Sequence, residues 1–128
     1  MRLASVALVV RDYDEALRYF VDKLGFVLIE DTDLGVEKRW VRVAPPGGGA
    51  ALLLARAVGT DQVEAIGAAG GGRVAFFLDV DDFRATYDAM RAQGVAFQEE
   101  PRRESYGWVA VFADLYGNRW DLIERSAA

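Results

Sequence analysis

The chain has 128 residues, of which 52% are hydrophobic and 27% are charged, a composition typical of one globular domain with a single sizeable core. It contains neither cysteine nor histidine, which excludes disulfides, thiolate or imidazole metal ligands, and hydrolases that need a Cys–His or Ser–His pair. The formal net charge of −5 argues against a nucleic-acid partner, because phosphate binding depends on Lys and Arg.

The apolar runs of the chain are short. The longest, such as residues 6–10 and 50–55, cannot span a bilayer, and no signal-peptide pattern is present. We therefore expect a cytoplasmic protein that has no membrane partner.

An internal repeat organises the chain. Identical residues recur 68 positions apart, as in Trp40 and Trp108 (108 − 40 = 68). The same separation relates Val6-Ala7 to Val74-Ala75, Tyr19 to Tyr87, Val43 to Val111, Gly49 to Gly117 and Leu54 to Leu122. The repeat predicts two copies of one module, 1–56 and 73–126, within a single domain that spans 1–128.

The first module opens with an apolar run at 6–10, which predicts a buried strand. A helix should follow, because Asp12 and Glu15 have the spacing of a capping box and Gly25 can end the helix. Further strands are expected at approximately 27–31, 39–44 and 50–55, with the Pro- and Gly-rich residues 45–49 as the last turn.

Residues 57–72 are rich in glycine and predict a flexible linker, with one helical turn near 62–66. The second module then repeats the pattern: a strand at 74–78, and a helix whose start is crowded by acidic residues and which ends at Gly94. Its remaining strands are expected at approximately 96–99, 107–113 and 119–124.

Each module is therefore predicted to be βαβββ. A four-stranded sheet with one helix on one face leaves its other face open. Two such modules predict an α+β fold in which the sheets curl into a half-barrel whose concave side can hold a ligand. Pairing of the modules within one chain and pairing across a dimer both remain open.

Two stretches carry a resemblance to a known superfamily. The first is VALVVRDYDEA at 6–16, followed by Tyr19-Phe20 and by LGF at 24–26; the second is DLYGNRWDLIE at 114–124. Placed at the two ends of a duplicated chain, they resemble the vicinal-oxygen-chelate superfamily of glyoxalase I, the bleomycin-resistance proteins and the extradiol dioxygenases. The resemblance covers nearly the whole chain, and for relatives of this length it implies a homodimer.

The resemblance also implies where a metal would bind. Metal-containing relatives place ligands on the first and last strand of each module, at positions that correspond here to Ser5, Leu53, Arg73 and Asp121. Leu53 cannot coordinate, Ser5 is a weak ligand and Arg73 would repel a divalent ion, which leaves Asp121 alone. We therefore expect no metal and no other cofactor.

The same positions are candidates for ligand binding, because strand alternation should direct them, together with Phe77, into the half-barrel. Arg73 and Asp121 are expected to lie close together. They could act as a polar recognition pair and as candidate catalytic residues, or they could form an internal ion pair that only stabilises the fold.

Three aromatic residues complete the candidates. Trp40 and Trp108 could enclose a flat ligand or belong to the core, and the sequence does not fix the face that either takes. Tyr106 lies on the loop before Trp108, where binding residues often gather.

Three functions fit this pattern. The first is a bleomycin-resistance-like protein that binds a small organic molecule in an apolar cup without the family metal. The second is a metal-independent isomerase or lyase, with Asp121 as base and Arg73 stabilising an oxyanion. The third is a metal-dependent glyoxalase or dioxygenase with a displaced site drawn from Asp79, Asp81 or Asp82, although these residues are better explained as helix-start charges.

Overall fold

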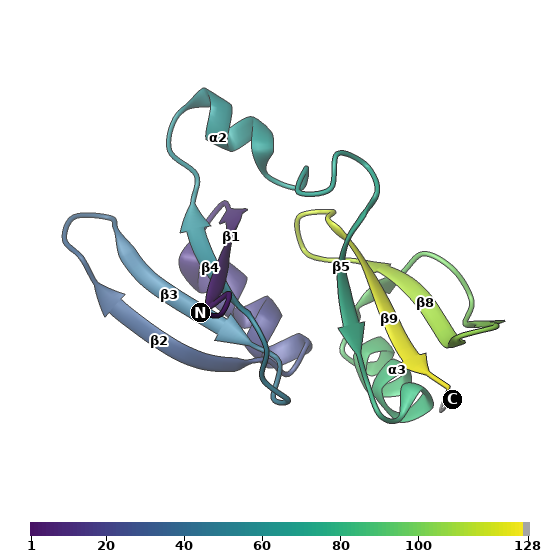
Figure 1. Ribbon diagram of the computed structural model, residues 1–128. Helices are drawn as coiled ribbons and strands as arrows, with labels where there is room; N and C mark the ends of the chain where they lie inside the picture. Colours follow the sequence, from purple (N-terminus) through teal and green to yellow (C-terminus); the bar gives the residue numbers. More distant parts are fainter. Residues whose placement is uncertain (127–128) are drawn as a thin grey trace. The chain divides into compact units, whose positions relative to one another are not determined.

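The computed structural model describes residues 1–126 of the chain. The chain divides into two compact units, Met1–Ala69 and a second that begins at Gly70, a boundary inside the predicted linker. Within the described residues, each unit has one mixed sheet that does not close into a barrel (Figure 1). The expected α+β class with open sheets is confirmed. No helix within residues 1–126 is long and apolar enough to cross a membrane.

The first unit has the predicted βαβββ order. Its elements are β1 (Ser5–Val10), α1 (Tyr13–Leu17), the π-helix η1 (Arg18–Lys23), β2 (Val27–Asp33), β3 (Arg39–Ala44), β4 (Ala51–Arg56) and α2 (Thr60–Ala65). The strands lie in the order β1-β4-β3-β2, with β1 parallel to β4 and the other neighbours antiparallel. Helix α2 lies where a helical turn was expected in the linker and begins two residues earlier.

Helix α1 begins as its sequence predicts. The Asp12 carboxylate accepts a hydrogen bond from the Glu15 backbone N–H at 2.8 Å and so satisfies one of the free donors of the first turn. The helix continues into η1 and ends at Gly25, whose φ of +78° suits glycine.

The first sheet has two faces of different character. The face toward α1 and η1 is an aliphatic core whose side chains are at most 2% exposed: Leu8, Val10, Val41, Val43 and Leu54, with Phe20 from η1. Alternation places Ser5, Trp40, Arg42 and Leu53 on the opposite side. We call this side the helix-free face of the first sheet.

The second unit repeats the order with one added strand. It contains β5 (Val74–Asp79), α3 (Phe83–Ala92), β6 (Ala96–Phe97), β7 (Arg102–Glu104), β8 (Gly107–Ala113) and β9 (Arg119–Arg125). The sheet order is β5-β9-β8-β6, and β7 also pairs with β8. The strand predicted at 96–99 is therefore shorter than expected, and β7 was not predicted.

The strands of the second core contribute aromatic rings, whereas the buried strand residues of the first core are aliphatic. Phe83, Tyr87 and Met90 form the buried side of α3. Beneath the helix, the rings of Phe112 and Trp120 stack with their centroids 5.7 Å apart. The Glu124 carboxylate accepts the Phe83 backbone N–H at 2.8 Å, which ties the start of α3 to β9.

The turn between β8 and β9 is held by one buried carboxylate. Asp114 is 5% exposed and accepts hydrogen bonds from the backbone N–H groups of Tyr116 (2.9 Å) and Asn118 (3.0 Å). It also accepts from the indole Nε1 of Trp120 at 3.0 Å. The DLYGN part of the second motif therefore has a structural role, and it fixes the turn before β9.

The spacing of the repeat changes along the chain. The helix-capping residues Asp12 and Asp82 are 70 positions apart (82 − 12), whereas the glycines that follow the helices, Gly25 and Gly94, are 69 apart (94 − 25). The wider turn of η1 accommodates the extra residue of the first helix. The turn before β4 (45–50) is also one residue longer than the turn before β9 (114–118), which restores the separation of 68.

Candidate functional site

Asp121 lies in the middle of β9, on the side of the second sheet away from α3. Its neighbours in register are Phe77 of β5 and Val111 of β8. We call the side that carries Phe77, Val111, Arg119 and Asp121 the helix-free face of the second sheet.

The Asp121 carboxyl is half-buried, and its Oδ1 atom is shielded from solvent without a hydrogen-bond partner among the described residues. Burial raises the pKa of this carboxyl above its ordinary value; the positive charge of Arg102 opposes the rise, Glu99 adds to it and Arg119 opposes it. A shielded acceptor without a partner is costly in a protein, so a ligand donor could satisfy it.

Asp121 lies beside the exposed ring of Phe77, and the two arginines that influence its charge already have other hydrogen-bond partners. Phe77 is 56% exposed beside the carboxyl. The Arg102 guanidinium pairs with Glu99 (Nε to Oε1, 3.1 Å) and with Glu104, and the latter contact raises the pKa of Arg102. Arg119 donates to the Gln98 side chain at 3.1 Å. Within the described residues, neither arginine forms an ion pair with Asp121; each is paired with another side chain.

The expected pairing of Arg73 with Asp121 is wrong. Arg73 is exposed and precedes β5, and within the described chain it forms no ion pair with Asp121. The register explains this, because a bulge between Val74 and Phe76 leaves Phe77 as the β5 residue opposite Asp121. The two residues therefore do not form an internal ion pair in place of a metal.

In the first sheet, Leu53 takes the position of Asp121, and the central charged residue is instead Arg42 on the neighbouring strand β3. Arg42 lies opposite Leu53 and donates from Nε to the Ser5 hydroxyl at 2.9 Å. Its Nη1 lies 3.5 Å from Oε1 of Glu30. The sequence analysis did not single out Arg42. A charged residue within the largely apolar strand RWVRVA, on the same side of the sheet as Leu53, could have indicated it.

The two repeat-related tryptophans lie on different sides of their sheets. Trp40 shares the helix-free face with Arg42 and is 41% exposed. Trp108 lies toward α3, with its ring stacked on Phe83 at 6.3 Å and the Arg103 guanidinium 5.7 Å from the ring centre. Tyr106 is exposed just before β8.

The four family metal positions do not fit a divalent cation. Leu53 offers no donor atom, and the Ser5 oxygen accepts from the cationic Arg42. Arg73 is itself a cation, and Asp121 alone provides a hard ligand. The displaced set does not gather either: Asp82 accepts the Ala85 N–H at 3.1 Å as the cap of α3, and Asp79 pairs with Arg125 at 3.2 Å. Among residues 1–126, no three acidic side chains are placed to hold a metal.

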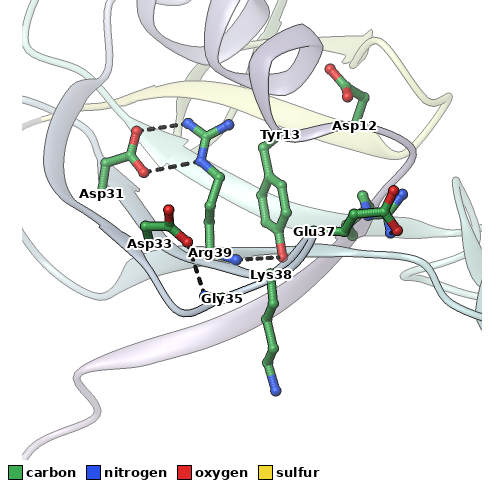
Figure 2. Close-up of a pocket in the computed structure, with 9 residues that line it drawn as sticks. Asp12, Tyr13, Asp31, Asp33, Gly35, Glu37, Lys38 and Arg39 are labelled. Atoms are coloured by element: carbon green, nitrogen blue, oxygen red, sulfur yellow. Dashed lines mark hydrogen bonds and ion pairs between the residues drawn. The ribbon is translucent and has the colours of Figure 1, made fainter.

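A polar depression of about 560 Å³ lies at the β2–β3 end of the first unit (Figure 2). Arg39 crosses it and forms a bidentate pair with Asp31 at 2.7 and 3.1 Å, which lowers the pKa of Asp31. Its backbone N–H donates to the Tyr13 hydroxyl at 3.3 Å, and Arg56 pairs with Glu37 at 3.3 Å. The Tyr13 contact joins the β2–β3 hairpin to α1, and the Arg56–Glu37 pair joins it to β4. None of the site residues predicted from the sequence lines this depression.

Comparison with known proteins identifies the class. Residues 2–122 match the model of the Glyoxalase/Bleomycin resistance protein/Dioxygenase superfamily, and the chain belongs to this superfamily. An uncharacterized protein from Shewanella frigidimarina is 52% identical over 95% of this chain and 92% of its own length.

Two solved structures are similar over almost the whole chain. UcmS2 is 31% identical with a TM-score of 0.82, covering 96% of this chain and 97% of its own. TnmS3, described as an antibiotic binding protein from Streptomyces sp. CB03234, is 26% identical with a TM-score of 0.77 over 98% of this chain and 97% of its own.

Proposed function

We propose that the protein binds a small organic molecule on the helix-free face of the second sheet and needs no metal for this. The observation that carries the proposal is the Asp121 carboxyl, which is half-buried, has a shielded oxygen without a partner and lies beside the exposed ring of Phe77. Small-molecule sites usually combine apolar walls with a few such polar groups.

The similarity to TnmS3 supports the same kind of function, since that protein is described as binding an antibiotic. A ligand N–H or hydroxyl group would satisfy the Asp121 oxygen, and an apolar ring of the ligand would cover Phe77. A flat molecule that carries a cationic or other donor group therefore fits this face best.

A titration with a panel of flat drugs, followed by tryptophan fluorescence and calorimetry, tests the proposal. We expect saturable binding that Asp121→Asn and Phe77→Ala each weaken, the former by about tenfold, because a hydrogen bond to a charged group is lost. Asp88→Asn is the matched control, since Asp88 is exposed on α3. The proposal fails if the unaltered protein binds no member of a broad panel.

A second candidate is a metal-independent isomerase or lyase in which Asp121 accepts a proton. The raised pKa of Asp121 favours it, because a carboxyl with a raised pKa is a stronger base than an ordinary one. Arg102 and Arg119, rather than Arg73, are the cations that influence this carboxyl. Unchanged turnover of an identified substrate by Asp121→Asn would exclude this reaction.

We further propose a cytoplasmic homodimer, in keeping with the family resemblance. Sedimentation equilibrium of the purified protein tests the oligomeric state, and a monomer at micromolar concentration would reject it. Cell fractionation tests the compartment.

A further inference from the structure

The helix-free face of the first sheet carries a half-buried cation that the fold does not fully use. The Arg42 side chain is 22% exposed and lies opposite Leu53, between Ser5 and Glu30. Leu53 has Ala7 as its other neighbour in register, so the groups around the guanidinium are mostly small or apolar. A cation in such surroundings interacts more strongly with an anion than a fully hydrated cation does.

The protein partners of Arg42 leave part of its hydrogen-bonding capacity free. Nε donates to the Ser5 hydroxyl at 2.9 Å, whereas the Nη1 contact with Glu30 is long, at 3.5 Å. The Glu30 side chain is 42% exposed, so water competes for it. Nη2 has no partner among the described residues. A guanidinium in this state can donate a hydrogen bond to a carboxylate or phenolate oxygen.

An exposed aromatic ring lies on the same face. Trp40 is two residues before Arg42 in β3, so both side chains leave the same side of the sheet. Trp40 is 41% exposed and has Thr32 opposite it on β2. An indole beside a guanidinium is suited to a ring that bears an anionic oxygen, because the ring can stack while the oxygen pairs with the cation.

We propose that Trp40 and Arg42 form a binding surface for an aromatic anion, in which Arg42 pairs with the carboxylate or phenolate oxygen and Trp40 stacks on the ring. This inference rests on the proposed small-molecule function and adds a ligand class to it. Arg42 lies in the first unit and Asp121 in the second, so the two surfaces are tested with separate variants.

Three probes separate the contribution of the negative charge from that of the aromatic ring. They are naphthalene-2-carboxylate, the neutral naphthalene-2-carboxamide, and cyclohexanecarboxylate, which lacks the aromatic ring. We expect the unaltered protein to bind naphthalene-2-carboxylate about tenfold more tightly than the amide, because only the carboxylate forms a charge-assisted pair. In ¹H–¹⁵N spectra, the Arg42 Nε–H and the Trp40 indole N–H should shift on binding.

Variants of Arg42 and Trp40 show which residue provides each contribution to the affinity. Arg42→Gln should remove the preference for the carboxylate over the amide, and Trp40→Leu should weaken both naphthalene probes but not cyclohexanecarboxylate. Trp108→Phe is the control for Trp40, since Trp108 lies against α3. Arg84→Gln is the control for Arg42, since Arg84 is exposed on α3.

Glu30→Gln distinguishes a binding role from a purely structural role of Arg42. This change leaves Arg42 in place and removes the carboxylate that competes for it, so naphthalene-2-carboxylate should bind several-fold more tightly. Glu37→Gln, which removes an exposed partner of Arg56, should leave binding unchanged. The comparison of Glu30→Gln with Glu37→Gln tests the role of Arg42 even if Arg42→Gln does not fold.

Equal affinity for the carboxylate and the amide, or a preference that survives Arg42→Gln, overturns the inference. If other members of the drug panel still bind in that case, the proposed function stands and only the ligand class is wrong. If neither the panel nor the three probes bind, both proposals fail together.

Discussion

The two units share the βαβββ order and, apart from the added β7, one sheet topology, yet the central charged residues of their helix-free faces have opposite signs. In the first unit the charge is Arg42 on β3, opposite the apolar Leu53 of β4; in the second it is Asp121 on β9, opposite the apolar Val111 of β8. The buried strand residues differ as well: those of the first unit are aliphatic, whereas those of the second include the stacked rings of Phe112 and Trp120. The two units have therefore kept the same pattern of strand pairing, while the side chains on their helix-free faces differ in charge and polarity.

Two polar turns, the β8–β9 turn of the second unit and the β2–β3 turn of the first, give the largest expected difference between the units. Asp114→Ala removes the acceptor for four donor groups and leaves buried donors unpaired, so the free energy of unfolding should fall by about 3 kcal/mol. Urea unfolding followed by circular dichroism measures this. Asp33→Ala, which removes one exposed turn contact in the first unit, should cost less than about 1 kcal/mol. Equal losses would contradict the role assigned to Asp114.

The repeat-related tryptophans should respond differently to truncation. Trp108→Ala removes a ring that stacks on Phe83 and should lower the free energy of unfolding by about 2 kcal/mol. Trp40→Ala removes a ring that is 41% exposed and should cost less than about 1 kcal/mol. Thermal unfolding of both variants checks the order, and a larger loss for Trp40 would reverse the assignment of faces.

The helix caps should respond alike, because both units use the same device. Asp12→Ala and Asp82→Ala each remove a side-chain acceptor for an N–H in the first turn and should each cost about 1 kcal/mol. Chemical denaturation measures both changes. If only one variant lost stability, the two caps would have the same geometry but would not contribute equally to the free energy of unfolding.

The smallest expected effect concerns the pH dependence of the Asp121 contribution. Because folding raises the pKa of this carboxyl above 3.8, its favourable contribution is present below that pH and is lost as the pH rises through the folded-state pKa. Asp121→Asn should therefore become more stable relative to the unaltered protein as the pH increases from acid to neutral. Unfolding free energies of both proteins at several pH values test this. The opposite slope would mean that the carboxylate is stabilised in the fold.

Part of the candidate site was predictable from the sequence. The position of Asp121 on the last strand follows from the DLYGNRWDLIE motif, and the turn before it is fixed by Asp114 within the same motif. Arg73 was expected beside Asp121 because both correspond to metal-ligand positions of relatives, whereas the bulge in β5 leaves Phe77 opposite Asp121. Arg42 was missed because its importance depends on contacts with Ser5 and Glu30, which are distant in the chain.

The sequence by itself determined the βαβββ order of both units apart from β7, the two helix starts and the superfamily, because capping residues, apolar runs and motifs act locally. Only the tertiary structure decided how the strands of the two units align and which face each tryptophan takes. The π-helical turn in η1, the bulge in β5 and the longer turn before β4 each change the alignment of the two units by one residue. A shift of one residue reverses the face of a strand side chain, so Trp40 lies on the helix-free face while Trp108 packs toward α3.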